Sequence, residues 1–299
     1  MLRKDLKMKR ILSFLLAACT LLSMTTSAFA LEKGDARAVI GADITEGQKA
    51  AVYKAFGIER DSVKELSVTN SEEREYLDGL VASSIIGTRS ISCVYIEILG
   101  EGEGLQVSTS NINWCTKEMY ANALVTAGID NAKLIVTSPI EGISGTAALT
   151  GVYKAYEDIT GEQLDEVAKL AGTQELVITA ELANEIGDYD AVTIVNELKK
   201  ILAETVDMTD SELEDEIKSI AADNNISVSD GQIKQLVSLC RSLEKLDPSE
   251  LKAKVESLQD TVKKLAGAQA KVSEIASSVG SFFKSVGNFF SDLFSKIGK

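Results

Sequence analysis

Hydrophobic and polar positions along the chain change their period several times, and each period predicts a particular element. Residues 63–69 alternate between apolar and polar side chains, as in a half-buried strand. Thr45 and Gln48 have the spacing of a capping box and predict a helix that ends at Gly57. The same criteria predict a helix at 71–80, strands at 89–99 and 105–114, a helix at 117–127, a strand at 133–137 and a helix at 144–160.

The order of these elements predicts the fold of the first part of the chain. From residue 63 to residue 137 the order is strand, helix, strand, strand, helix, strand, which is that of a split βαβ, or ferredoxin-like, arrangement. Residues 100–104 read Gly-Glu-Gly-Glu-Gly and predict the turn of a hairpin between the strands on either side. We therefore expect an α+β fold, with an α/β domain over residues 31–203.

The second half of the chain is predicted to be helical. Thr209 and Ser229 each begin a capping box, and Asp247 precedes a proline, which is typical of the first position of a helix. Leu, Ile and Val follow each start at spacings of three and four residues. These patterns predict a helical hairpin or bundle over residues 204–275, and its last helix is long enough to project as an arm.

The first thirty residues have the pattern of a secretory signal peptide. Five basic residues precede an apolar run from Ile11 to about Met24, and small residues precede Ala30. The sequence therefore predicts cleavage after Ala30 and a protein that is extracellular or associated with the cell envelope. The Leu-Ala-Ala before Cys19 resembles a lipobox, but the residues after Cys19 stay apolar, so lipidation there is the less favoured alternative.

The last segment, residues 276–299, predicts a basic amphipathic helix. It holds five of the six phenylalanines outside the signal peptide, and three lysines against one aspartate. We expect its apolar side chains to contact a membrane surface or an envelope protein; the alternative is that they pack on the protein's own helices or close a homo-oligomer. These side chains form a stripe at helical spacing with three neighbours beside it: Phe282, Val286, Phe289, Leu293 and Ile297, with Phe283, Phe290 and Phe294.

Charge narrows the classes of partner. The whole chain has a net charge of −14, and the signal peptide contributes five basic residues and one aspartate, so the remaining 269 residues carry −18. Nucleic acids require clustered lysine and arginine, and we therefore expect no nucleic-acid partner. The same charge argues against contact between the body of the protein and anionic lipid, and it favours solubility outside the cell.

The residue types needed for most catalytic sites are missing from the sequence. The chain has no histidine, which excludes Ser-His-Asp and Cys-His nucleophiles and histidine-ligated zinc. No phosphate-binding loop, dinucleotide-binding motif or calcium-binding loop is present in the sequence. We therefore predict no catalytic, cofactor-binding or metal-binding residues, and a non-enzymatic binding protein. The alternative is a hydrolase that uses carboxylates or a Ser–Lys pair.

Three cysteines follow the signal peptide, and we expect free, buried thiols. Cys93 and Cys115 lie on the two arms of the predicted hairpin, roughly 13 Å apart at the rise of an extended strand. That separation is too long for a disulfide. Cys240 is the third, and an odd number is awkward for a disulfide framework.

A few polar residues stand out at predicted loops. Ser144, Gly145 and Thr146 begin a predicted helix and could present main-chain N–H groups to an anion, although the simpler interpretation is a helix cap. Asp43 and Arg89 are candidates for surface features, and Trp114 is interpreted as a core residue.

Six stretches of the chain together resemble the motifs of a known family. They are Ile40–Thr45, Val68–Asn70 with Glu72, Glu73, Tyr76 and Leu77, Ile86–Ser92, Asn111–Trp114, Met119–Leu124 and Ser144–Gly151. These motifs resemble those of the YpuA-like family, exported proteins of Gram-positive bacteria that are defined as a domain of unknown function. The resemblance implies export and a Gram-positive envelope, and it implies no catalytic residue. Cys93 and Cys115 occupy positions where serine and valine are expected in relatives, which argues against thiol chemistry.

Overall fold

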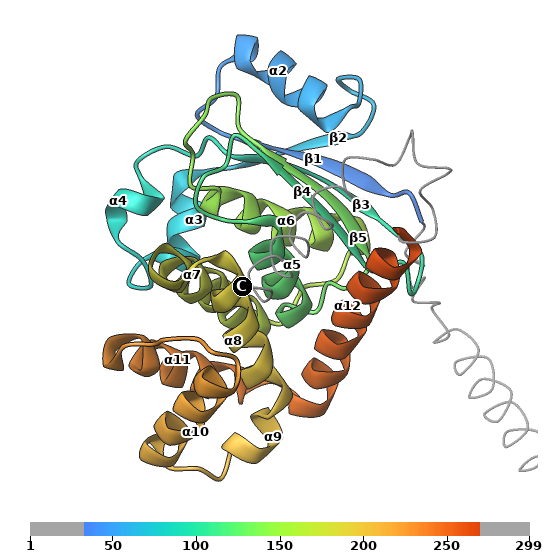
Figure 1. Ribbon diagram of the computed structural model, residues 1–299. Coiled ribbons are helices and arrows are strands. Elements are labelled where there is room, and N and C mark those ends of the chain that lie inside the picture. The colour runs from blue at the N-terminus through green and yellow to red at the C-terminus, as the bar shows by residue number, and fades with distance from the viewer. Residues whose placement is uncertain (1–32, 270–299) are drawn as a thin grey trace, which may run out of the picture. The chain divides into compact units, whose positions relative to one another are not determined.

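Five strands form one mixed sheet in the order β2-β1-β3-β5-β4 (Figure 1). The computed structural model describes residues 33–269, with side chains as far as residue 258. Strands β1, β2, β4 and β5 are mutually parallel, and β3 runs antiparallel between β1 and β5. The strands are β1 (Ala36–Gly41), β2 (Lys64–Val68), β3 (Cys93–Ile98), β4 (Leu105–Ser110) and β5 (Ala132–Thr137).

The helices of the described residues follow in chain order around and after this sheet. Capping boxes start α2, α3, α5, α10 and α11, which satisfies main-chain N–H groups of the first turn. The helices are α2 (Glu46–Phe56), α3 (Asn70–Leu77), α4 (Ser83–Ile86), α5 (Lys117–Thr126), α6 (Thr146–Thr160), α7 (Glu166–Ile186), α8 (Asp188–Lys200), α9 (Leu202–Thr205), α10 (Asp210–Asp223), α11 (Asp230–Leu243) and α12 (Pro248–Gln269).

The two faces of the sheet pack against different helices (Figure 1). Helix α2 covers one face with Val52, Tyr53 and Phe56, which form a small apolar cluster with alternate residues of β1 and β3. Helices α5 and α6 cover the other face, where Val39, Ile96 and Leu134 are fully buried. Both faces of the central strands are therefore apolar, as expected for buried strands.

The helices after α6 continue the larger core and do not stand apart from it. The apolar cluster that contains Val39 of β1 extends through Leu176 of α7, Ile194 of α8 and Leu236 of α11 to Val255 of α12. Contacts join α7 to α5 and α12 to both α8 and α5. The described part of α12 thus packs on its neighbours, although the sequence predicted an arm.

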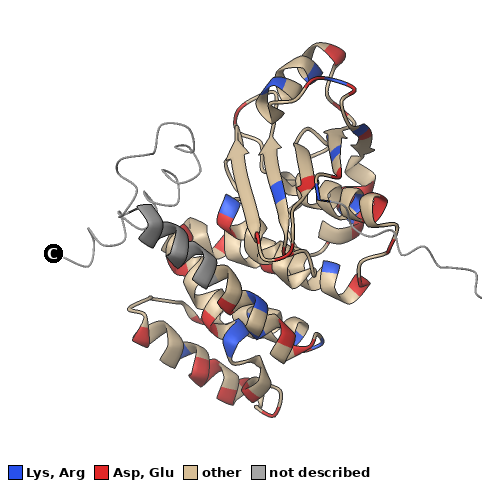
Figure 2. Ribbon diagram, turned by 90° about the vertical axis from the view of Figure 1, so that its right-hand side faces the viewer, with Lys and Arg blue, Asp and Glu red and all other residues tan. Residues whose placement is uncertain are grey.

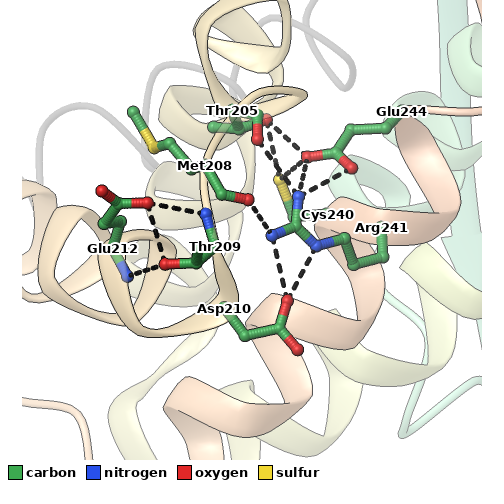
Figure 3. A network of polar contacts seen from close by, with 8 residues as sticks. All are labelled: Thr205, Met208, Thr209, Asp210, Glu212, Cys240, Arg241 and Glu244. Carbon is green, nitrogen blue, oxygen red and sulfur yellow. Dashed lines mark hydrogen bonds and ion pairs between the residues drawn. The ribbon is translucent and has the colours of Figure 1, made fainter.

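Arg241 of α11 links α11 to α9 and α10 by hydrogen bonds and ion pairs (Figure 3). The Arg241 guanidinium of α11 donates to the main-chain oxygens of Thr205 and Met208, at 3.1 and 2.7 Å. It also pairs with Asp210 at 3.0 Å and with Glu244 at 2.8 Å. These bonds hold the turn between α9 and α10 against α11.

Most predicted elements exist, but the strand order differs from the predicted one. The α+β class and the helical region that follows are confirmed. The hairpin across residues 100–104 is wrong, because β5 lies between β3 and β4 and pairs with both. The split βαβ order is not observed either, since the parallel strands of each βαβ unit are adjacent, β1 with β2 and β4 with β5. The strand Ala36–Gly41 was not predicted.

The physical reason lies in the two faces of each strand. Strand β5 buries Ala132, Leu134 and Val136 on one face and half-buries Ile135 on the other, so it is stable inside the sheet. Strand β4 buries Leu105 and Val107 but leaves its alternate residues exposed, so it fits an edge. The helical connection through α5 then places the two strands side by side and parallel.

Two predicted segments lie outside the described residues: the signal peptide at 1–30 and the amphipathic segment at 276–299. The boundaries at residues 203 and 275 stay predictions. Within the described part of the chain, no helix has both the length and the hydropathy needed to cross a bilayer.

Candidate functional site

The carboxyl ends of the four parallel strands lie at the same end of the sheet. This end, which is distinct from the two outer edge strands β2 and β4, is the candidate functional site, called below the carboxyl edge. In open α/β sheets, ligands bind outside the carboxyl ends of the strands. The segments that follow β1, β2, β4 and β5 all contribute polar residues here, as does the segment that leads into β3. Five of the six stretches that carry the family resemblance lie at or beside the carboxyl edge of the sheet; the sixth belongs to α5.

The start of α6 is fixed by contacts with its neighbours. Gly145, with φ of 97°, is the N-cap residue, and its carbonyl oxygen accepts a hydrogen bond from the buried Tyr120 hydroxyl. The N–H of Ala148 donates to the Ser92 hydroxyl at 3.0 Å. The helix cap expected within Ser144, Gly145 and Thr146 is therefore present at Gly145, but no side chain caps the helix; the Ser144 hydroxyl lies 3.1 Å from the Thr146 hydroxyl.

A buried carboxyl group, that of Glu73 in α3, completes this chain of hydroxyls. Glu73 is 1% exposed and accepts hydrogen bonds from the Thr146 hydroxyl and from the Asn70 amide. Burial raises the pKa of Glu73 above its ordinary value, although these hydrogen bonds oppose the effect. Both carboxylate oxygens have partners, so Glu73 serves to hold the start of α6 against α3.

Replacing Glu73 by glutamine is expected to remove one pH-dependent contribution to stability. Because burial raises its pKa, the folded state holds a proton on Glu73 at pH values where the unfolded state has lost it. The contribution is full below the pKa of the unfolded state and decreases as pH rises through the folded-state value. Urea denaturation across that pH range should show the free energy of unfolding of the wild type falling relative to that of Glu73→Gln.

Glu72 provides the control of opposite sign. Desolvation would raise its pKa, but hydrogen bonds from Lys154 and Thr69 outweigh it, and the pKa of Glu72 is lowered. The wild type should therefore gain stability relative to Glu72→Gln as pH rises. A difference between the wild type and Glu73→Gln that does not change with pH would contradict this account of Glu73.

The three surface candidates have different environments. Asp43 is exposed, and its carboxylate accepts a hydrogen bond of 2.7 Å from the main-chain N–H of Ser90, so it fixes the segment before β3. Arg89, in the segment that leads into β3, is exposed at the carboxyl edge of the sheet. Trp114 is half-buried between the large core and a smaller cluster around Leu77, in line with a core residue. Among the described residues, its indole N–H has no hydrogen-bond partner.

All three cysteines of the described chain are free and buried, as predicted. The predicted hairpin, on which part of that expectation rested, is wrong, so the thiols agree with the prediction for a different reason. Burial raises the pKa of Cys93 to about 12 and that of Cys240 to about 11. Because the thiolate is the reactive form, these side chains act as small apolar groups.

A second polar cluster, which the sequence did not predict, lies between α5, α7 and α8. Lys199 and Glu175 are both 0% exposed, and the Lys199 amine lies 2.8 Å from the Glu175 carboxylate. The amine also donates to the main-chain oxygen of Asn122 at 3.3 Å, and Thr126 donates to Glu175. Burial lowers the pKa of Lys199, and Glu175 opposes that effect. Because neither side chain is exposed to solvent, we interpret this ion pair as structural.

The site residues predicted from the sequence are not tested by these contacts. Phe282, Phe283, Val286, Phe289, Phe290, Leu293, Phe294 and Ile297 all lie outside the described residues. Among the described residues, no group of three or more Cys, Asp or Glu side chains is arranged to hold a metal ion. Sequence reasoning missed Glu73 because a glutamate in a polar helix start gives no signal of burial.

Comparison with known proteins identifies the family. Residues 40–265 match the family described as "Protein of unknown function (DUF1002)". The chain therefore belongs to this family, which confirms the resemblance drawn from its motifs. The uncharacterized protein YpuA of Bacillus subtilis (strain 168) is 40% identical over 243 residues, which are 80% of this chain and 83% of that protein. No solved structure matches the chain.

Proposed function

We propose that the protein is an exported, non-enzymatic binding protein of the cell envelope, attached reversibly to an anionic membrane surface by residues 276–299. The observation that carries the proposal is the contrast between the two parts of the chain. Residues 282–294 hold five phenylalanines, and the segment that contains them carries three lysines against one aspartate. The rest of the exported chain is strongly acidic, and anionic lipid repels it.

Several buried polar side chains are bonded to neighbouring residues, which supports a non-enzymatic role. The carboxyl group of Glu73 and the amine of Lys199 are each bonded to neighbouring side chains, and the three thiols are buried. Groups held in this way stabilise the fold. Acidic residues recur along the helical region (Figure 2), which fits a body that stays in solution.

The size of the apolar stripe supports reversible attachment. Burying one phenylalanine contributes about 1.5–3 kcal/mol, so five partly buried ones contribute roughly 5–10 kcal/mol before the loss of conformational freedom. That range is sufficient for association with a surface and too small for a permanent anchor.

Flotation with vesicles tests the proposal. The chain from residue 31 to residue 299 should float with vesicles of anionic phospholipid, and the chain that ends at residue 275 should not. Phe282→Ser with Phe289→Ser should weaken flotation strongly, since both side chains lie on the apolar stripe. Ser281→Ala with Asn288→Ser, on the opposite face, should leave it unchanged.

Two results would reject the membrane assignment. One is equal flotation of the full and the shortened chains. The other is a shortened chain that has lost stability or an oligomeric state, as circular dichroism and light scattering would show, because this would mean that the segment packs within the protein or between copies.

A further inference from the structure

The two edges of the sheet differ in how they are protected. At the β2 edge, the Lys154 amine donates to the main-chain oxygen of Ser67 at 2.7 Å, and Lys64 of the strand pairs with Asp158. Charged side chains on or beside an edge strand disfavour pairing with another chain. Lys154 and Lys64 therefore disfavour pairing of β2 with a strand of another chain.

The β4 edge has no such protection. Its six residues, Leu105–Ser110, read Leu-Gln-Val-Ser-Thr-Ser and include no charged residue and no proline. The strand pairs with β5 in unbroken register, so no bulge turns it away. On its other side, no main-chain hydrogen bond joins β4 to any described residue. Natural edge strands usually carry at least one of these devices.

The side chains of β4 hold the strand in place and leave its outer edge accessible. Leu105 and Val107 anchor one face in the core. On the other face, Gln106, Ser108 and Ser110 are exposed. The Ser108 hydroxyl donates to the main-chain oxygen of Leu134 at 3.4 Å, so this side chain is directed toward β5 and away from the outer edge.

We propose that two copies of the protein associate by antiparallel pairing of their β4 strands, which joins the two sheets into one. Antiparallel pairing of a strand with itself is symmetric, so the same surface of each copy provides both halves of the interface. Main-chain hydrogen bonds between edge strands supply the attraction, as in β-strand addition. This inference concerns a different part of the chain from the membrane proposal and does not depend on it.

Charge favours this edge as the meeting point of two copies. Each exported chain carries a net charge of −18, so copies repel one another wherever acidic surfaces meet. Strand β4 is uncharged. In an antiparallel pair, Glu101 and Glu103 before one strand face the end that carries Asn111 and Asn113 in the other copy. Carboxylates are therefore placed toward amides, where like charges do not meet.

Side-chain direction limits the register. Directly opposed residues must point to the same face, and the two such registers with the greatest overlap of the strands place Ser108 opposite Ser108, or Gln106 opposite Ser108 of the other copy. Lysine at both 106 and 108 places like charges opposite each other in either register. Glutamate at both positions does the same with the opposite sign.

Light scattering during size exclusion, without lipid and over a wide range of protein concentration, tests the proposal on the chain from residue 31 to residue 299. The wild type should become dimeric as concentration rises, and Gln106→Lys with Ser108→Lys should remain monomeric. The glutamate pair should also remain monomeric, which separates strand pairing from a general effect of net charge. Gln163→Lys with Ser84→Lys, at exposed positions elsewhere, should dimerise as the wild type does.

Hydrogen exchange gives an independent reading. Main-chain amides of peptides that cover 105–110 should become more protected in the wild type as concentration rises, and should not in the lysine variant. A wild type that stays monomeric throughout, or a dimer that persists in both charge variants, would overturn the proposal. A third result would also overturn the proposal: the chain that lacks residues 276–299 stays monomeric, and protection of 105–110 in the full chain does not change with concentration. Association would then belong to residues 276–299.

Discussion

Replacing Lys199 by methionine is expected to lower the free energy of unfolding by about 3–5 kcal/mol, because the change leaves a buried carboxylate without its partner. Glu175 is 0% exposed, and the Lys199 amine is its cationic neighbour at 2.8 Å. Without that amine, the Glu175 carboxylate is buried with no cationic neighbour, which is unfavourable. The measurement is urea denaturation at neutral pH, followed by circular dichroism.

The adjacent Lys200 offers a matched control. Its side chain is 24% exposed and pairs with Glu197 on the same helix. Ion pairs of this kind contribute about 0.2–1 kcal/mol, so Lys200→Met should have a small effect. A similar loss of stability in both variants would show that burial of the pair is not the cause.

The double variant Lys199→Met with Glu175→Leu separates the charge from the packing. With both charges removed, neither is left unpaired in the interior, so the double variant should be more stable than Lys199→Met alone. Thr126 then loses its acceptor, so wild-type stability should not be fully restored. A double variant less stable than Lys199→Met would mean that the pair itself stabilises the packing of α7 and α8.

Replacing Gly145 by alanine should destabilise the protein through two separate effects. The residue has φ of 97°, a left-handed conformation that costs roughly 1–2 kcal/mol for a residue with a Cβ atom. A Cβ atom there would lie 2.5 Å from the Tyr120 hydroxyl oxygen and 2.8 Å from Ile112 Cγ2. Forcing atoms into a packed interior costs about 1–3 kcal/mol more, and the loss of stability should therefore reach roughly 2–5 kcal/mol.

Gly161, at the other end of α6, isolates the steric part of that effect. It also has a positive φ, of 70°, but a Cβ atom would meet nothing within 4 Å. Gly161→Ala should therefore show only the backbone penalty. Thermal or urea denaturation of the two variants gives the steric contribution as a difference, and equal losses would show that Tyr120 and Ile112 move aside at little cost.

The contacts of Tyr120 explain why its movement is unfavourable. It is fully buried, and its hydroxyl donates to the main-chain oxygen of Gly145 itself. Moving the ring away from a new methyl group would break that bond at a fully buried hydroxyl, which is unfavourable. The packing of α5 against the start of α6 thus requires glycine at 145, and this is a requirement of the fold.

The amino-acid sequence alone determined the local elements. Capping boxes at Thr45, Thr209 and Ser229 mark the starts of α2, α10 and α11, because these side chains bond the N–H groups of their own first turn. The alternation of apolar and polar residues located β2, because this pattern reports which face of one strand is apolar. The family also followed from local motifs, and residues 40–265 confirm it.

Tertiary structure alone decided which distant residues meet. Strand β5 takes the place between β3 and β4 because it has buried or half-buried residues on both faces, a property that depends on neighbouring elements and that no single segment reveals. The burial of Glu73 against Thr146, and of Lys199 against Glu175, joins residues of different elements. The edge left open at β4 depends on the order of the whole sheet. Local pattern fixes the period of an element, whereas burial and pairing depend on all its neighbours at once.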